Sequence, residues 1–329
     1  MNWSIILEST LEAMVSKNAV VFALAAIGLN IHYGYTGLLN FGQAGFMAAG
    51  AYGTGIAITQ WGWSIGLAAG FGLVLSVLLA LFLGLPTLRL RADYLAIVTI
   101  AAAEIIRRVV KSTQYSSVTG GSGGLNGIGR GFYDANPFND RLDLGIVDFS
   151  ARQLWFIVVG WTVVGLCMLL TYLLVRSPWG RVLKAIREDE DAVRSLGKNV
   201  TWYKMQSLIL GGLFGALGGI MLTLEQQSVQ PDQFFTPTTF FAFTALILGG
   251  AGRVFGPVVG SMVFWGIIQF TDVFLRESIR NDLIPTSIMD GVQAGQVRFI
   301  VAGGLLAALM IFRQQGMFGN KREVALDGH

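Results

Sequence analysis

Residues 18–88 read NAVVFALAAIGLNIHYGYTGLLNFGQAGFMAAGAYGTGIAITQWGWSIGLAAGFGLVLSVLLALFLGLPTL and contain no Asp, Glu, Lys or Arg. A helix needs about 20 mostly apolar residues to cross the hydrocarbon core of a bilayer, so this stretch has room for roughly three crossings. Glycine and interfacial aromatic residues interrupt it at 33–37 and 60–63. These interruptions divide the stretch into predicted spans near 18–34, 37–60 and 64–86.

Further apolar segments follow along the chain. They predict spans near 94–110, 154–175, 205–224, 237–250, 255–271 and 296–312. The segment 237–250 is short, so a half-helix or a re-entrant segment stays open as an alternative to a full crossing. No stretch alternates polar and apolar residues as the strands of a membrane barrel do. The sequence therefore predicts an all-α, polytopic integral membrane protein with about nine transmembrane helices.

The composition of the whole chain agrees with this class. Of the 329 residues, 53% are hydrophobic and only 13% are charged, and the mean hydropathy is +0.60. A soluble domain carries about 25% charged residues, so an ordinary cytosolic enzyme is excluded. The net charge of +3 is a mild basic excess, typical of loops beside anionic lipid. Membrane lipid is thus the expected surrounding, and no nucleic-acid partner is expected.

Basic residues are concentrated in the segment 176–204, which holds Arg176, Arg181, Lys184, Arg187, Arg194, Lys198 and Lys204. The positive-inside rule places this loop in the cytoplasm. Alternation then places the loop 113–151 outside. It places a further set of basic residues inside: Arg89, Arg91, Arg253, Arg313, Lys321 and Arg322. The predicted organisation is an N-terminal segment 1–17, a transmembrane domain 18–315 and a cytoplasmic tail 316–329.

The cytoplasmic loop carries local helix signals. Ser177 followed by Pro178 is a typical helix start, and a second start follows Asp189. Gly197 is a natural residue to end a short helix over 190–196. We expect the apolar side of this helix, with Val193 and Leu196, to need a partner surface; the alternative is that the loop is a solvated connector.

Small residues mark predicted helix contacts. Two glycine triplets at i, i+4 spacing are Gly211, Gly215 and Gly219 in one span, and Gly252, Gly256 and Gly260 in another. In lipid, such faces let helix backbones approach closely, so we expect them to serve helix packing.

Four polar residues within or beside the spans are candidates to line a transport pathway: Asn30, Asn40, Gln43 and Glu104. The alternative for the amides is that they join helices through hydrogen bonds. The alternative for Glu104 is an intrahelical ion pair with Arg107 or Arg108. His32 is expected at the membrane interface. With one cysteine and two histidines, no disulfide and no metal site are expected.

Several segments resemble a known family. DAVRSLG at 191–197 resembles the E-A-A-x-x-x-G loop of ABC importer permeases. Four longer segments are similar to the branched-chain amino acid ABC permeases: GYTGLLNFGQAGFMAAGAY (34–52), LRLRADYLAI (88–97), TGGSGGLNGI (119–128) and LGGAGRVFGPVVG (248–260). The long external loop after the fourth span resembles the LivM type of that family.

The resemblance implies the ABC importer permease fold and a place in the plasma membrane of a prokaryote. It also implies partners: a LivH-type second permease, two cytosolic ATPase subunits that carry ATP and Mg, and an extracytoplasmic substrate-binding protein. The residues implied to contact an ATPase subunit are Arg187, Glu190, Asp191, Ala192, Val193, Leu196 and Gly197. The implied cargo is branched-chain amino acids, and urea or short-chain amides remain an alternative because their permeases share this scaffold.

Motifs for chemistry within the chain are missing from the sequence. It has no G-x-x-x-x-G-K-[ST] phosphate loop, so we expect a transport subunit with no nucleotide site, no cofactor and no catalysis of its own. An ion-coupled secondary transporter or channel is a weaker hypothesis, since Glu104 alone offers an intramembrane charge. A membrane-embedded enzyme is weaker still, because H-E-x-x-H and Ser/His constellations are lacking.

Overall fold

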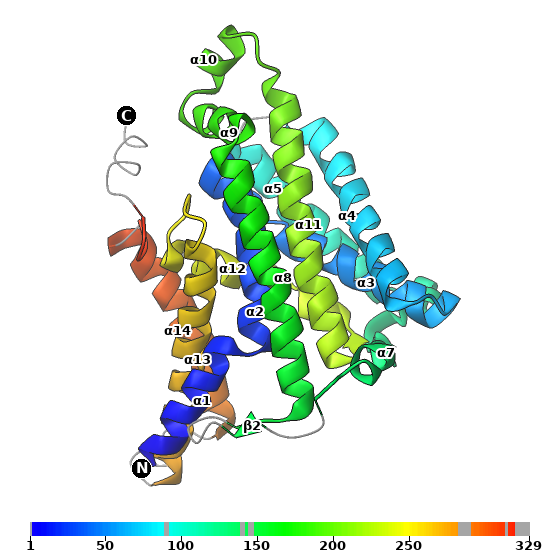
Figure 1. Cartoon of the computed structure of the whole chain (residues 1–329), viewed down its shortest axis with the longest axis vertical. Helices are drawn as coiled ribbons and strands as arrows, with labels where there is room; N and C mark the ends of the chain where they lie inside the picture. Colours follow the sequence, from blue (N-terminus) through cyan, green and yellow to red (C-terminus); the bar gives the residue numbers. More distant parts are fainter. Residues whose placement is uncertain are drawn as a thin grey trace.

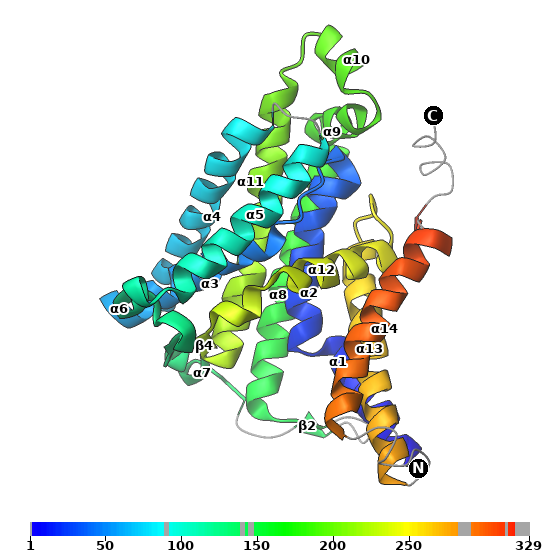
Figure 2. The same ribbon diagram turned by 180° about the vertical axis from the view of Figure 1, so that it is seen from behind.

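Helices account for most of the chain in the computed structural model (Figures 1 and 2). The structure describes residues 2–88, 92–138, 142–143, 148–281, 291–312 and 315–319. The predictions for Arg89, Arg91, Arg313, Lys321 and Arg322, and for residues 320–329 of the tail, lie outside the described residues.

The first half of the chain forms five long or medium helices and a π-helical segment. Their bounds are α1 Trp3–Val15, α2 Lys17–Leu29, the π-helix η1 Asn30–Tyr35, α3 Gln43–Trp61, α4 Ile65–Thr87 and α5 Ala92–Lys111. A loop region with short elements follows: η2 Thr113–Tyr115, α6 Ser116–Thr119, η3 Gly121–Gly123, β1 Leu125–Asn126, α7 Arg130–Asp134, β2 Leu142–Asp143 and β3 Asp148–Phe149.

The second half contains α8 Ala151–Arg176, α9 Pro178–Glu188, α10 Glu190–Ser195, α11 Val200–Gln226, β4 Ser228–Val229, η4 Pro231–Phe234, α12 Thr236–Gly249, α13 Gly256–Arg280 and α14 Gly291–Phe312. The strands form two short antiparallel pairs. Leu125 pairs with Val229 in one, and Leu142 pairs with Phe149 in the other. The first pair ties the loop 113–151 to the segment that follows α11.

Five described helical segments are long and apolar enough to cross a membrane: Trp3–Tyr35, Ile65–Thr87, Ala151–Arg176, Val200–Gln226 and Gly256–Arg280. Each of the nine predicted spans has a helix, but the count of nine crossings stays a prediction. The 14 residues of α12 give a length of about 21 Å, less than the roughly 30 Å of the hydrocarbon core. This length agrees with the predicted half-helix alternative for 237–250.

The predicted N-terminal segment 1–17 contains a helix of its own. Residues 3–15 form α1, which packs along α13, and the run continues into α2 after a break at Ser16, whose backbone is extended (ψ 175°). The predicted first span begins at residue 18, because Glu8 and Glu12 interrupt the apolar pattern before it. In the structure, the apolar helical run begins at Trp3. α2 then lies at the centre of the bundle with most of its residues buried.

The two halves of the bundle meet around α2 and α11. α11 packs against α2, α3 and α4, while α12 and α13 pack against α2 from the other side (Figures 1 and 2). α9 and α10 lie at one end of the molecule, whereas α6, α7 and β2 lie at the opposite end. The loops 176–204 and 113–151 thus occupy opposite ends, as their predicted locations on opposite sides of a membrane require.

Candidate functional site

A buried polar cluster lies between α2, α3 and α11. Asn30 and His32 belong to η1, Asn40 precedes α3, and Gln43 is the first residue of α3; all four are 0% exposed. Buried amides and imidazoles destabilise a fold unless their polar atoms have partners. The hydrogen bonds of these four residues therefore show what the cluster does in this conformation.

Asn30 binds the turn between α12 and α13. Its Nδ2 donates to the carbonyl oxygen of Arg253 at 2.8 Å, and its Oδ1 accepts from the backbone N–H of Gly252 at 2.8 Å. One side chain thus satisfies both kinds of backbone group in a turn more than two hundred residues away in the sequence. Asn30 thereby fixes η1 to the second half of the bundle.

His32, Asn40 and Gln43 form a directional chain. The Nε2 of His32 lies 3.2 Å from the carbonyl oxygen of Leu208, and its Nδ1 lies 3.0 Å from Asn40 Nδ2. A carbonyl accepts and an amide nitrogen donates, so the proton is on Nε2 and the ring is neutral. Asn40 Nδ2 also donates to Gln43 Oε1 at 3.2 Å, and Gln43 Nε2 donates to the carbonyl oxygen of Gly211 at 3.1 Å.

These contacts bear on two predictions. The ring of His32 is fully buried between η1 and α11, while its expected depth at the membrane interface stays a prediction. For Asn30, Asn40 and Gln43, the geometry corresponds to the alternative in which amides join helices through hydrogen bonds. Their role in lining a pathway stays a prediction.

The first glycine triplet lies where α11 meets α2 and α3. A Cβ placed on Gly211 would lie 2.5 Å from the carbonyl oxygen of Gly28, and one on Gly215 would lie 2.5 Å from Gln43 Nε2. A Cβ on Gly219 would lie 2.7 Å from the carbonyl carbon of Met47. A Cβ does not fit at such distances, so Gly211 and Gly219 allow close contact with neighbouring backbone, and Gly215 leaves room for the amide of Gln43.

The second triplet only partly follows its prediction. Gly256 and Gly260 lie on α13 and face α12; a Cβ on Gly260 would lie 2.6 Å from the backbone nitrogen of Gly249. Gly252 is not on the same helix face, because α13 begins at Gly256 and Gly252 lies in the preceding turn with a φ of +76°. Glycine adopts this left-handed conformation without the cost that a Cβ imposes.

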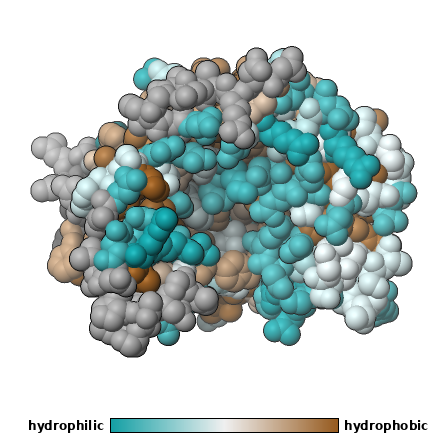
Figure 3. All heavy atoms as spheres, turned by 90° about the horizontal axis from the view of Figure 1, so that it is seen from below, coloured by the Kyte–Doolittle hydropathy of each residue, from teal (hydrophilic) through white to brown (hydrophobic). Residues whose placement is uncertain are grey.

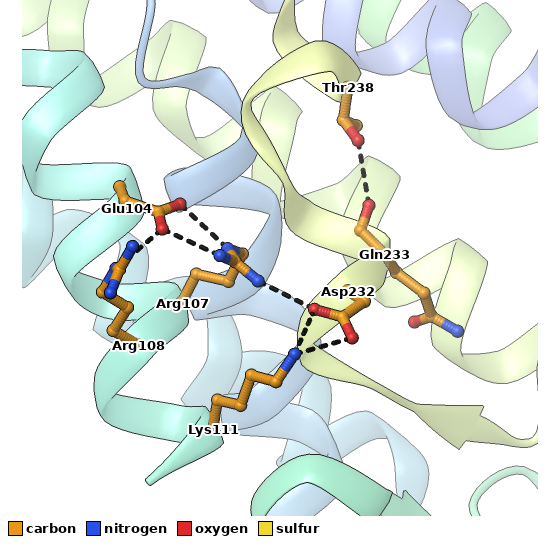
Figure 4. Close-up of polar contacts among 7 residues, drawn as sticks. All are labelled: Glu104, Arg107, Arg108, Lys111, Asp232, Gln233 and Thr238. Carbon is orange, nitrogen blue, oxygen red and sulfur yellow. Dashed lines mark hydrogen bonds and ion pairs between the residues drawn. The ribbon is translucent and has the colours of Figure 1, made fainter.

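A charged cluster joins α5 to η4 (Figure 4). The carboxylate of Glu104 accepts from Arg107 Nη2 at 2.8 Å and from Arg108 Nε at 2.9 Å. Arg107 also donates to Asp232 at 2.7 Å, and Lys111 donates to the same carboxylate at 2.9 Å. Sequence reasoning anticipated the pair of Glu104 with the neighbouring arginines but missed Asp232, which lies far away in the chain.

Asp232 connects this cluster to the start of α12. The Lys111 and Arg107 cations that bind it hold its pKa below the ordinary carboxyl value. The backbone carbonyl of the neighbouring Gln233 accepts from the hydroxyl of Thr238 at 3.0 Å in the first turn of α12. The position of α12 is therefore tied to α5 through η4.

The loop 176–204 folds as the local signals predict. α8 ends at Arg176, Pro178 is the first residue of α9, and Asp189 caps α10 by accepting from the N–H groups of Asp191 and Ala192, each at 2.9 Å. Gly197 has a φ of +77° directly after the short helix. These caps satisfy backbone groups that a six-residue helix would otherwise expose.

The apolar side of α10 corrects one expectation. Val193 is only 5% exposed, because it packs against Leu183 and Ile186 of α9 and Val200 of α11. Leu196 is 79% exposed. The expectation that Val193 needs a partner protein to bury it is therefore wrong, since α9 and α11 already cover it, while Leu196 remains uncovered within this chain.

Ion pairs fix the acids of α10. Glu190 binds Arg194 at 2.8 Å and also binds Lys204 at the start of α11, and Asp191 binds Arg194 at 2.6 Å. The side chain of Asp191 is 87% exposed, so it faces outward despite this pair.

Arg187 connects the loop to the buried polar cluster. Its Nη1 donates to the carbonyl oxygen of Gly34 in η1 at 2.6 Å. The Arg187 side chain also lies against Gly37, which has a φ of +73°.

A further hydrogen bond joins α9 to α11. Trp179 Nε1 donates to Gln206 Oε1 at 2.7 Å.

Metal ligands do not gather in the described part of the chain, where no group of three or more His, Cys, Asp or Glu could hold an ion. The ion pair of Lys17 and Glu225, whose Nζ and Oε1 lie 2.9 Å apart, was not predicted either. Its two members border separate predicted spans, so nothing in the sequence connects them.

The sequence matches the profile of a family described as branched-chain amino acid transport system / permease component, over residues 13–310. The chain belongs to this family. It is therefore a transport subunit and a multi-pass protein of the cell membrane, with the membrane-embedded helices described above.

Curated relatives include both permease types. The LivM high-affinity branched-chain amino acid transport permease of Salmonella typhimurium is 28% identical, covering 92% of this chain and 71% of its own. A probable LivM of Methanocaldococcus jannaschii is 26% identical, with 92% and 91% covered. LivH of Escherichia coli is 27% identical, with 91% of each covered. A solved structure, PsaBC from Streptococcus pneumoniae in complex with Fab, aligns at a TM-score of 0.42 and 16% identity over 96% of this chain and 94% of its own.

Proposed function

We propose that this chain is the LivM-type permease subunit of an ATP-binding cassette importer that moves branched-chain amino acids inward. The observation that carries the proposal is the folded α9–α10 unit at one end of the bundle. It exposes Leu196 and Asp191 outward and contacts the backbone of η1 through Arg187. We expect such a unit to bind a partner protein and to transmit the partner's movement to the membrane helices.

The proposed assembly contains further subunits. A LivH-type permease would supply the other half of the pathway, two ATPase subunits would bind ATP and Mg, and an extracytoplasmic protein would deliver the substrate. The sequence of this chain has no phosphate loop, so the energy would come from the ATPase subunits. The similarity to both LivM and LivH relatives supports a pair of related permeases.

For the α9–α10 unit, we propose contact with an ATPase subunit through Asp191, Ala192 and Leu196, which are all exposed. The fold of the unit itself would be stabilised by Arg187, Glu190, Val193 and Gly197. Residues are assigned to the contact surface or to the interior of the unit from their exposure and hydrogen bonds, not from the motif alone.

For the pathway, we propose that Glu104 contributes through the partly exposed face of α5. Its side chain is 27% exposed and that of Arg108 is 75% exposed, so charges of both signs lie on one accessible face. The amides of Asn30, Asn40 and Gln43 would contribute only in a conformation in which their hydrogen bonds open.

Uptake in cells tests the cargo. A strain that lacks this chain is complemented with the gene, and uptake of labelled leucine is measured in competition with isoleucine, valine, urea and acetamide. We expect restored leucine uptake that isoleucine and valine inhibit and that urea and acetamide leave unchanged. Restored uptake of urea or acetamide, with leucine uptake still lacking, would contradict the proposed cargo.

A further inference from the structure

An apolar cavity of about 200 Å³ lies beside α14 and is bordered also by the first turn of α2, by α12 and by α13. Aromatic and aliphatic side chains line it: Phe241, Phe264, Trp265, Ile268, Phe299 and Ala302. Phe299 is 41% exposed, so the cavity opens on the outer side of the helix bundle rather than in its interior. In a membrane-embedded subunit, such an opening faces lipid or another subunit.

Two polar side chains border the apolar walls, those of Arg298 and Asn18. Arg298 is exposed and is the only charged residue in the sequence of α14, within its apolar part Gln293–Leu309. Its guanidinium lies over the ring of Phe299, 4.9 Å from the centre, and it forms no ion pair or hydrogen bond within the described part of the chain. A cation beside hydrocarbon is costly unless it reaches the headgroups or binds an anion. An anionic lipid headgroup would satisfy Arg298.

Acids on α11 and α13 each have a cation of their own. Asp272 of α13 binds Arg276, whose Nε lies 2.9 Å from Asp272 Oδ2, and Glu225 of α11 binds Lys17 at 2.9 Å. Since the members of each pair neutralise one another, Arg298 gives the described rim of the cavity a positive charge. A positive rim on an apolar cavity favours a ligand that combines an anion with hydrocarbon.

The mouth of the cavity lies near the end of the molecule that carries the loop 113–151. Asn18 borders both this cavity and a polar cavity at that end, which Tyr133 and Phe149 of the loop also line. Figure 3 shows that end, where hydrophilic residues gather on the described surface. Arg298 lies about 10 Å along the helix axis from Gly291, the first residue of α14. At this depth the polar end of the molecule meets the apolar sides of the helices, as a phospholipid headgroup meets its acyl chains.

We propose that this cavity binds one acyl chain of an anionic phospholipid whose phosphate binds Arg298 and the amide of Asn18. The chain would lie against Phe241 and Phe299, and the headgroup would lie towards the polar end of the molecule. A lipid fits this cavity better than a second permease does, because a flexible chain fills a narrow apolar space and the phosphate supplies the anion. The inference concerns the lipid around the subunit and does not depend on the proposed cargo.

Lipid binding to the purified transporter tests the proposal. The complete transporter in detergent is titrated with phosphatidylglycerol, which has a net negative charge, or with zwitterionic phosphatidylcholine of the same chains, and bound lipid is counted by native mass spectrometry. We expect a saturable phosphatidylglycerol site that fills at about tenfold lower concentration than with phosphatidylcholine. Glycerol 3-phosphate, which has the anion but no acyl chain, should not compete.

Two variants with matched controls locate the site. Arg298→Gln removes the charge at the cavity, and Arg130→Gln removes the same charge at an exposed position of α7. Ala302→Leu, at a residue that is 2% exposed, fills the cavity from α14, and Ala307→Leu adds the same atoms at an exposed position of that helix. We expect Arg298→Gln to lose the preference for phosphatidylglycerol and Ala302→Leu to bind both lipids about tenfold more weakly, while both controls bind lipid as the wild type does.

Three results would overturn the proposal. The first is equal binding of the two lipids to the wild type, or an unchanged preference in Arg298→Gln. The second is competition by glycerol 3-phosphate at the concentration of the lipid, which would indicate an anion site without an acyl chain. The third is loss of the second permease from Arg298→Gln with lipid binding unchanged, which would assign this face to that subunit. None of these results involves leucine, so uptake by the same proteins tests the proposed function separately.

Discussion

At the scale of single residues, the interior of the bundle depends on side chains that bind distant backbone. Asn30 binds the turn at residues 252–253, and Gln43 binds the carbonyl oxygens of both Ala25 and Gly211. In a membrane, apolar side chains contribute little to helix association, because lipid is equally apolar. Hydrogen bonds and close glycine contacts therefore have a larger part in determining how these helices fit together.

The first prediction concerns Asn40. Asn40→Leu leaves His32 Nδ1, the Gly42 N–H and one hydrogen bond of Gln43 without this partner. An unsatisfied buried polar group costs about 1–3 kcal/mol, so we expect a clearly lower unfolding temperature in detergent. Asn126→Leu changes the same residue type at an exposed position and should leave the temperature unchanged. Normal stability of Asn40→Leu combined with lost uptake would instead assign Asn40 to the pathway.

The second prediction compares two glycines. Gly215→Ala places a methyl group 2.5 Å from Gln43 Nε2, whereas Gly165→Ala on α8 places one where nothing lies within 4 Å. Both changes raise helix propensity by about 1 kcal/mol, so a difference between the unfolding temperatures of the two variants measures the effect on packing. Overpacking costs about 1–3 kcal/mol, and we expect a lower unfolding temperature only for Gly215→Ala. Equal temperatures for the two variants would show that the α11 glycines do not determine the packing.

At the scale of elements, the α9–α10 unit is a folded part of this chain rather than a free loop. Asp189 caps α10, Val193 packs against α9 and α11, and Arg187 binds η1. η1 is a π-helix, a rare form that is frequently found at functional sites. Through the contact of Arg187 with Gly34, we expect a displacement of the unit to act on the element that also carries Asn30 and His32.

The third prediction separates the docking surface of α10 from its interior. Leu196→Asp changes an exposed residue, so we expect a folded loop with weaker ATPase binding, by about tenfold or more if Leu196 is an interface anchor. Val193→Asp places a carboxylate among apolar side chains and should instead make the loop sensitive to limited proteolysis. Co-purification with the ATPases and proteolysis measure the two effects.

Thr201→Asp is the control for these variants, because it adds the same charge to an exposed position at this end. It should leave ATPase binding unchanged. Unaltered binding and uptake in Leu196→Asp would show that α10 does not contact the ATPase through this residue.

The fourth prediction concerns the ion pairs between α5 and η4. Asp232→Asn removes the charge that binds Arg107 and Lys111. Because the pKa of Asp232 is lowered, these pairs stabilise the folded state above the ordinary carboxyl pKa, and this contribution is lost as the pH falls through the lowered value. The Asp232 side chain is 61% exposed, so we expect a stability difference of only about 0–1 kcal/mol at neutral pH.

Unfolding temperatures across a pH series check this prediction. The difference between the wild type and Asp232→Asn should decrease in acid and in high salt, whereas Asp134→Asn, at an exposed position of α7, should match the wild type throughout. A difference that stays constant into strong acid would contradict the assigned cause.

At the scale of the whole molecule, the α9–α10 unit lies at one end of the bundle, and α7 and β2 of the loop 113–151 lie towards the other (Figure 1). α11 connects the two regions, since it begins beside α10 and is followed by β4, which pairs with β1 of the loop 113–151. Under the proposed function, one end of the bundle would contact an ATPase subunit and the other would face the extracytoplasmic side.

The sequence predicts the helical class and the local boundaries well, because their causes are local. Ser177 with Pro178, Asp189 and Gly197 determine helix ends through neighbouring backbone groups. The burial of Val193 could not be predicted, because it depends on how α9 and α11 meet in space.

The partners of the polar residues could not be predicted for the same reason. Asp232 and Glu225 bind cations more than one hundred residues away, and Asn30 binds a turn rather than another side chain. The turn at Gly252 was mistaken for helix because glycine spacing alone does not reveal a positive φ.

Reconstituted transport tests the central claim most directly. This chain, its second permease, the ATPase subunits and the binding protein are placed together in proteoliposomes without an ion gradient, and accumulation of labelled leucine is measured with and without ATP. We predict accumulation that requires ATP and that ceases when this chain or the ATPases are left out. Accumulation by this chain alone, driven by an ion gradient without ATP, would contradict the account and indicate a secondary transporter.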